Sequence, residues 1–116
     1  MVLRYNKTIE FFNSYGSKPS KELDFIPDKK RIKLDECIKH LNILLTKALK
    51  SFHVIYNKTQ FQSLNTKIST CGRHCILRAI MLQQFDLNLQ QYINFMKKLK
   101  NDNSLDFDEI VAIFIK

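Results

Sequence analysis

The chain lacks tryptophan and contains only two glycines, two prolines and three cysteines among its 116 residues. An odd number of cysteines does not make a closed disulfide framework, and free thiols are typical of a reducing compartment. The first residues contain no apolar stretch of the kind found in signal peptides, so we expect the protein not to be secreted. The longest apolar run is short and is interrupted by lysines, which predicts that the chain does not cross a membrane.

Charge and hydrophobicity together indicate one basic domain over residues 1–116. The chain carries 19 basic and 11 acidic residues, for a formal net charge of +8, and 45% of its residues are hydrophobic. This length and hydrophobic content suffice for one core. The positive charge favours non-specific contact with DNA. A lysine-rich, solvated surface without a dedicated nucleic-acid partner explains the same charge, and both interpretations stay open.

Two periodic patterns, alternation and helical spacing, predict an α+β fold. Short runs indicate strands over Val2–Tyr5 and Ile9–Phe12, on either side of a turn. Phe52–Tyr56 is predicted as a third strand, with strand character again near Phe61. Apolar residues at helical spacing predict helices over three segments: Leu34–Ser51, Cys71–Gln84 and Leu89–Lys100.

The C-terminal segment leaves two alternatives open. Ser104 or Asp106 is suited to cap a last helix that continues through Ile110–Ile115. The apolar run Ile110–Ile115 also fits a buried strand, and its periodicity does not distinguish the two. In either case, we expect a small sheet packed on a central helix that begins at Cys71 and is apolar over much of its circumference.

The most informative motif is the segment 69–78, with the sequence STCGRHCILR. Cys71 stands at the predicted start of the central helix, where unpaired backbone N–H groups and the helix dipole favour negative charge. That position favours the thiolate, which is the nucleophilic form of cysteine. We expect Gly72 to permit a tight turn and to leave the sulfur accessible. The motif therefore indicates acyl transfer by a cysteine nucleophile.

Three carboxamides elsewhere in the chain fit the same chemistry. Gln60 and Gln62 lie shortly before Cys71, and a glutamine amide can donate a hydrogen bond to the oxyanion beside the backbone N–H of the nucleophile. Asn13 directly follows a predicted strand and precedes Gly16 in the sequence FFNSYG. A carboxamide fixed at a strand end is suited to orient a catalytic histidine.

These residues occur in the order Phe-Phe-Asn-Ser-Tyr-Gly, then Gln, then Thr-Cys-Gly-Arg-His, which resembles the adenain-like cysteine proteases. That family comprises the adenovirus maturation protease and its relatives in large DNA viruses, virophages and Polinton-like elements, and it is distantly related to the SUMO-deconjugating proteases. The resemblance covers about residues 2–16 and 52–84. It implies that Cys71 is the nucleophile, Asn13 orients the histidine and Gln62 is the oxyanion-hole donor, with Gln60 as an alternative donor.

The resemblance also implies an activity and a setting. It implies a viral cysteine endopeptidase, a hydrolase that cleaves capsid or core precursors after small residues, often glycines. In adenovirus the activity of this enzyme depends on viral DNA and a peptide cofactor. For the present chain we expect no cofactor and no metal. Its partners would be viral structural polyproteins, with DNA as a further contact and with no membrane association. Its location would be the virion or the viral factory in the host cytoplasm.

One element of the family pattern is absent from this chain. In the family, the catalytic histidine precedes the Asp or Asn, whereas only twelve residues precede Asn13 and none is histidine. All three histidines, His40, His53 and His74, follow Asn13. We therefore expect residues 1–116 to be the C-terminal part of an adenain-like domain, and we expect this chain alone to be inactive or incomplete.

A zinc site is a separate interpretation of the cysteines. Cys37-x-x-His40 and Cys71-x-x-His74, with Cys75 nearby, offer the ligand types of tetrahedral zinc. However, Cys37 and His40 lie inside a predicted helix, and buried cysteines ordinarily serve as small apolar residues. We therefore expect no metal.

Two other functions remain as alternatives to the protease. The chain is also compatible with a non-catalytic relative that keeps the protease fold as a binding module. A small basic nucleic-acid-binding protein, unrelated to proteases, is the second alternative. An in-frame histidine-bearing strand upstream of Met1 in the nucleotide sequence would favour the protease.

Overall fold

The structure is a computed structural model that describes residues 1–19, 40–64 and 69–116. Its strands form one sheet in the order β1-β2-β3. The strands are β1 (Val2–Tyr5), β2 (Thr8–Phe11) and β3 (His53–Tyr56). The helices are α2 (His40–Ala48), α3 (Cys71–Phe85), α4 (Leu89–Asn103) and α5 (Phe107–Phe114).

The sheet combines an antiparallel hairpin with one parallel strand. The register of the β1–β2 pair runs from Val2 opposite Phe11 to Tyr5 opposite Thr8, and Asn6 in the turn has a φ of 51°. Strand β3 runs parallel to β2, which requires a long connection between them. The three strands predicted up to Tyr56 are confirmed, with β2 beginning and ending one residue earlier than expected and β3 beginning one residue later.

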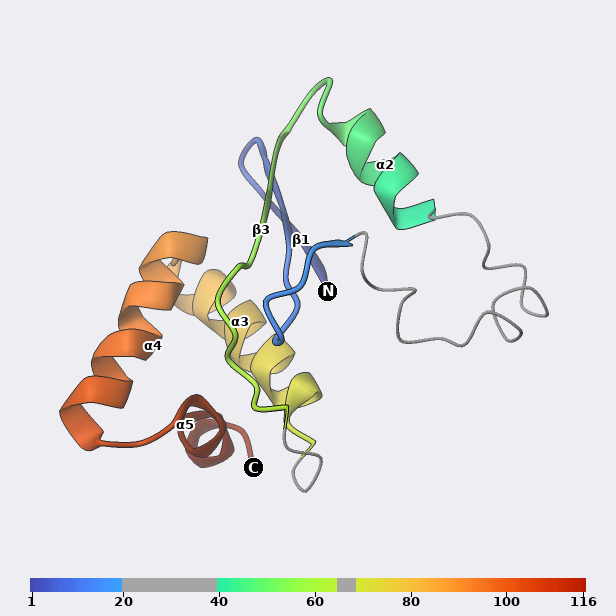
Figure 1. Cartoon of the computed structure of the whole chain (residues 1–116). Helices are drawn as coiled ribbons and strands as arrows, with labels where there is room; N and C mark the ends of the chain where they lie inside the picture. Colours follow the sequence, from blue (N-terminus) through green and yellow to red (C-terminus); the bar gives the residue numbers. More distant parts are fainter. Residues whose placement is uncertain (20–39, 65–68) are drawn as a thin grey trace, which may run out of the picture.

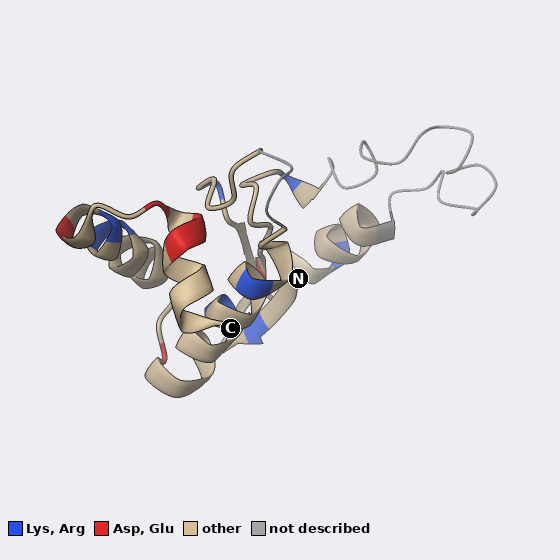
Figure 2. Cartoon of the chain, turned by 90° about the horizontal axis from the view of Figure 1, so that it is seen from below, with Lys and Arg blue, Asp and Glu red and all other residues tan. Residues whose placement is uncertain are grey.

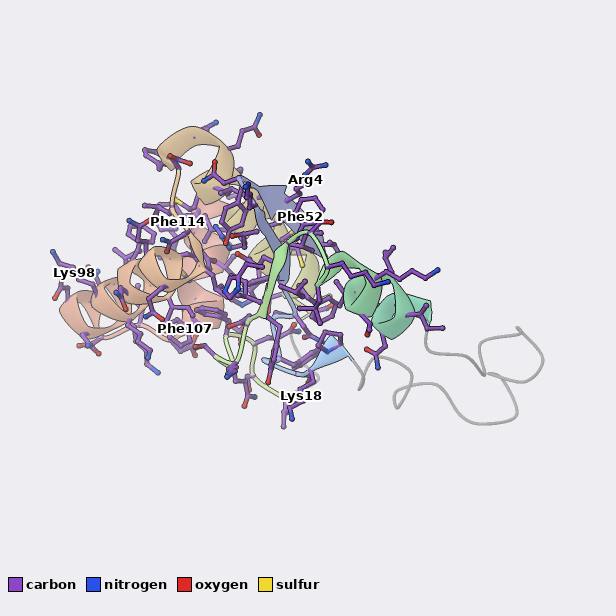
Figure 3. All side chains as sticks on the ribbon, turned by 90° about the horizontal axis from the view of Figure 1, so that it is seen from above. Arg4, Lys18, Phe52, Lys98, Phe107 and Phe114 are labelled. Atoms are coloured by element: carbon purple, nitrogen blue, oxygen red, sulfur yellow. The ribbon has the colours of Figure 1, made fainter. Side chains whose placement is uncertain are left out.

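The sheet packs against α3, which confirms the expected α+β fold with a central helix. Figure 1 shows the strands lying across α3, with α4 and α5 beside it and α2 at the far end of the sheet. The core is formed by buried apolar residues of α3, α4 and α5 and of the segments that follow β2 and β3: Phe12, Phe61, Leu77, Met81, Leu89, Tyr92, Ile93, Met96, Ile110 and Val111. On the opposite face of the sheet, the Arg4 guanidinium lies 4.8 Å from the ring centre of Phe52 (Figure 3).

The last helices begin at well-formed caps, which resolves the alternative at the C-terminus. Asp106 accepts from the backbone N–H of Glu109, and the Glu109 carboxylate accepts from the N–H of Asp106, so the terminal run is helix α5 and not a strand. Ser104 instead ends α4 in a left-handed conformation. Asn88 caps α4 in the same reciprocal way, as the sequence predicts.

Three sequence expectations need correction or lie outside the described residues. The strand near Phe61 is wrong, because the backbone N–H groups of Phe61 and Gln62 both donate to the Ser14 carbonyl in an irregular segment. Of the helix predicted from Leu34, the structure describes the part from His40, and residues 34–39 lie outside the described ranges. Helix α3 is also less apolar than expected, because its buried side includes His74 and Arg78 while Ile76 is half exposed.

Among the residues that the structure describes, no helix combines the length and apolar character needed to cross a bilayer. Among the described residues, lysine and arginine occur on α2, the sheet, α3 and α4, and acidic residues lie at the start of α5 (Figure 2).

Candidate active site

Cys71 is the first residue of α3, and its side chain is exposed. The preceding Thr70 occupies the N-cap position, yet its hydroxyl makes no capping bond and instead donates to the carboxylate of Asp108. The helix ladder starts with the backbone N–H of His74, which donates to the Thr70 carbonyl at 2.9 Å. Gly72 lies within α3 and has no positive φ, so the predicted tight turn is wrong. A Cβ added there would meet nothing within 4 Å apart from its two chain neighbours, and its effect on access to the Cys71 sulfur stays a prediction.

A cleft of about 230 Å³ brings Cys71 next to the loop that follows β2. Its walls are formed by Cys71 and Cys75 from α3, by Met1 and by residues 12–15. Asn13 and Cys71, which are separated by half of the chain, therefore face the same small cleft. This is the arrangement that the motif order predicts for these two residues.

Asn13 is held in place by its own loop. Its side-chain carbonyl accepts from the backbone N–H of Tyr15 at 2.8 Å, and its backbone carbonyl accepts from Gly16 at 3.0 Å. The side-chain amide of buried Asn57 also donates to the Asn13 carbonyl at 2.8 Å. These bonds fix the Asn13 amide just beyond the end of β2, where an orienting group is expected.

Gln62 is buried and does not itself line the cleft, but its side chain contacts a residue that does. Its side-chain carbonyl accepts from the Ser14 hydroxyl at 2.8 Å, and Ser14 lines the cleft. Gln60, the alternative donor, is exposed, and its amide donates to the Gln62 carbonyl at 3.1 Å. Of the two glutamines, Gln62 therefore lies in the position that adjoins the cleft.

None of the described histidine side chains lines the cleft. His74 is fully buried, its Nε2 lies 3.0 Å from Oδ1 of Asp108, and its Nδ1 has no partner among the described residues. Burial lowers the pKa of His74 below its ordinary value, although Asp108 acts in the opposite direction. His53 is exposed on β3, and the side chain of His40 lies outside what the structure describes.

Asp108 is a residue of this region that the sequence does not reveal. Its carboxylate accepts from the Thr70 hydroxyl, from His74 and, at 2.9 Å, from the backbone N–H of Ser63. Burial alone would raise the pKa of Asp108, but these hydrogen bonds outweigh burial and lower it. The carboxylate thereby joins the start of the Cys71 helix, the residue after Gln62 and helix α5.

A buried ion pair fixes α3 against the sheet. The Arg78 guanidinium donates to both carboxylate oxygens of Glu10 on β2, at 2.8 and 2.7 Å, and both side chains are fully buried. Arg78 also donates to the Leu87 carbonyl at 3.0 Å, and the Tyr5 hydroxyl donates to Glu10 at 2.8 Å. Burial, with Glu10 beside it, raises the pKa of Tyr5 to about 12. Because β2 leads to Asn13 and α3 begins at Cys71, the pair sets the relative position of these two residues.

Cys71 and His74, the candidate zinc ligands whose side chains the structure describes, have different surroundings. The described residues contain no group of three or more side chains that could hold a metal ion. His74 is directed to Asp108, whereas Cys71 is exposed to solvent, and Cys37 lies outside the described ranges.

The comparison with known proteins finds a relative in a virophage. Over 94 residues the chain is 36% identical to an uncharacterized protein of the Sputnik virophage, a match that covers 80% of this chain and 52% of the relative. The chain thus spans about half the length of this relative, and the similarity is consistent with a virophage origin. No model of a known protein family matches the chain, and no solved structure matches it.

Proposed function

We propose that this chain belongs to a viral cysteine endopeptidase of the adenain-like type, with Cys71 as its nucleophile. The observation that carries the proposal is that Asn13, Gln62 and Cys71 all lie at or next to one cleft. Asn13 and Cys71 line it, and Gln62 adjoins it through Ser14. Similarity to a virophage protein supports the viral setting. The substrates that we propose, viral capsid or core precursors, rest on the family resemblance.

The proposed chemistry proceeds through a thioester. The Cys71 sulfur attacks the carbonyl carbon of the substrate, and the amide hydrogen of Gln62 and the Cys71 backbone N–H stabilise the oxyanion. The C–S bond then replaces the C–N bond of the peptide, and the amine leaves with a proton from the general acid. Water subsequently hydrolyses the thioester and regenerates the thiol.

The general base of this proposal comes from outside the described residues. In this proposal, Asn13 orients a histidine that enters the cleft next to Met1. Met1 pairs with Phe12 in both directions, its carbonyl accepting at 2.8 Å and its amino group donating at 3.0 Å, so that it extends the β1–β2 ladder. Met1 also lines the cleft. Chain that continues β1 beyond Met1 would run past Asn13.

An activated ester tests the nucleophile and the oxyanion donor without the missing base. Acylation by a peptide p-nitrophenyl ester forms the thioester and releases nitrophenolate, which needs no proton from the enzyme. We expect one acyl group on Cys71, detected by intact-protein and peptide mass spectrometry. Gln62→Ala should slow this acylation by about 100-fold, which is the usual effect of removing an oxyanion donor.

Cys75→Ala is the matched control, because Cys75 lines the same cleft but lies one turn deeper in α3. It should leave acylation of Cys71 unchanged. Acylation distributed equally over the cysteines, or acylation insensitive to Gln62→Ala, would contradict the protease and favour a non-catalytic relative with the same fold.

A further inference from the structure

The side-chain amide of Gln62, the proposed oxyanion-hole donor, can adopt two orientations. A glutamine side chain ends in a carbonyl oxygen and an amide nitrogen, and rotation of the amide by half a turn exchanges them. Only the nitrogen can stabilise an oxyanion, whereas the oxygen would repel it. A buried glutamine in this role therefore needs a neighbour that recognises its oxygen.

Ser14 supplies that neighbour. Its hydroxyl donates to Oε1 of Gln62 at 2.8 Å, and both side chains are buried. Nε2 of Gln62 donates to no described residue, yet it is not one of the buried polar atoms without a partner, which are His74 Nδ1 and Tyr92 Oη. The Nε2 hydrogens are therefore accessible to an additional acceptor.

The reverse orientation of the amide is less favourable at this position. If Nε2 pointed to Ser14, the hydroxyl would have to accept, and its own hydrogen would need another acceptor. Among the described residues, the Ser14 hydroxyl has no hydrogen-bond partner besides Gln62. Leaving a buried donor without a partner is unfavourable, so the observed orientation is preferred.

The backbone of Ser14 holds the same glutamine. The Ser14 carbonyl accepts from the N–H groups of Phe61 at 2.8 Å and of Gln62 at 2.9 Å. Ser14 itself follows Asn13 in the cleft wall. One residue thus fixes the main chain of Gln62 through its carbonyl and the amide orientation through its hydroxyl.

We propose that Ser14 is the positioning residue that keeps the Gln62 amide nitrogen available to the oxyanion. The inference rests on the proposed function, because it assigns Ser14 a part in the same acyl-transfer site. It makes a specific statement about mechanism: Ser14 acts only through Gln62 and has no separate effect on the Cys71 thiol.

A peptide aldehyde tests this statement on the 116-residue chain. Acetyl-leucyl-alanyl-glycinal adds reversibly to a thiol, so that a C–S bond forms, the aldehyde C=O becomes a C–O single bond, and its oxygen takes up the thiol proton. Its affinity for Cys71 is measured as protection against iodoacetamide. Alkylation by iodoacetamide without aldehyde reports on the thiol itself, because that reaction places no substrate oxygen against the Gln62 amide, whereas the oxygen of the aldehyde adduct can accept a hydrogen bond from it.

The variants form a double-mutant cycle. We expect Ser14→Ala to weaken aldehyde binding by about tenfold, the worth of one well-placed hydrogen bond, with iodoacetamide alkylation changed by less than about twofold. In the Gln62→Ala background, Ser14→Ala should have no further effect. Ser14→Thr, which keeps the hydroxyl, should retain most of the affinity, and thermal unfolding of each variant establishes that it is folded.

The outcomes distinguish the role of Ser14 from the role of Cys71 as the nucleophile. Tight binding to the wild-type chain with equal binding to Ser14→Ala would overturn the role of Ser14 and leave the nucleophile in place. Additive effects of Ser14→Ala and Gln62→Ala would also overturn it, because Ser14 would then act independently. Absence of protection at wild-type Cys71 would overturn the proposed function and the role of Ser14 with it.

Discussion

At the scale of single residues, Gly16 determines how the Asn13 loop packs on the segment that leads to Gln62. Its φ of +73° is a conformation that other residues rarely adopt, and an added Cβ would lie 2.9 Å from the Lys58 carbonyl oxygen. The loop and the segment are therefore in direct backbone contact at this point. The positions of Asn13 and Gln62 at the cleft therefore depend on this contact.

Replacing Gly16 by alanine should therefore destabilise the protein by about 1–3 kcal/mol, since the backbone must shift and the φ is strained. The free energy of unfolding in urea measures this effect. Gly72→Ala is the matched control, because its Cβ meets nothing within 4 Å and Gly72 lies in the first turn of α3. That control should be neutral or slightly stabilising. Equal stability of Gly16→Ala and the wild type would show that the close contact is not formed.

His74 should make stability depend on pH. The pKa of His74 is lowered in the folded state. As the pH falls below 6.5, the ordinary pKa of histidine, the unfolded chain therefore binds a proton at this residue before the folded chain does. Stability due to neutral His74 is fully present above pH 6.5 and is lost as the pH falls. The lowered pKa of Asp108 extends the loss to pH values below 3.8.

Urea unfolding between pH 7.5 and pH 5 tests this dependence. The wild type should lose stability over this range, and His74→Gln should remove most of the loss. His53→Gln, at an exposed position, should retain it. An unchanged pH dependence in His74→Gln would assign the titration to another group.

At the scale of secondary-structure elements, the Glu10–Arg78 pair joins β2 to α3. Removing one member of a buried ion pair leaves an uncompensated charge. Arg78→Met should therefore lower the free energy of unfolding, measured in urea, by about 3–5 kcal/mol. The double variant Glu10→Leu, Arg78→Met should cost less than either single change, because it leaves no charge buried alone. Lys58→Met, at an exposed lysine, is the control and should change stability by less than about 0.5 kcal/mol. A double variant that is less stable than both single variants would contradict this account.

The elements themselves were largely predictable from local patterns in the sequence. Alternation located the strands, and the cap at Asn88 located α4, because these signals involve only neighbouring residues. The partnerships of Asp108 and Ser14 were not predictable, since each contact joins segments more than 30 residues apart. Phe61 was mispredicted as strand because its aromatic side chain is buried, packing 5.0 Å from the Phe107 ring, without a strand partner.

At the scale of the whole molecule, the β1–β2 hairpin directs its alternate residues toward α3. Met1, Leu3 and Tyr5 are partly buried on that side, whereas Val2 and Arg4 are exposed on the other. Because side chains alternate along a strand, a residue two positions before Met1 would face α3 and the cleft. A residue one position before Met1 would face away from both.

This alternation provides the most direct test of the central claim, that Cys71, Asn13 and Gln62 form a peptidase site completed by a histidine beside Met1. The measurement is hydrolysis of a fluorogenic glycyl-glycyl amide by chains extended at the N-terminus, with histidine either two residues or one residue before Met1. We predict that the unextended chain and the one-residue placement show background rates. The two-residue placement should show turnover that Cys71→Ala abolishes. Equal turnover at both placements, turnover that survives Cys71→Ala, or none at either placement would contradict the account.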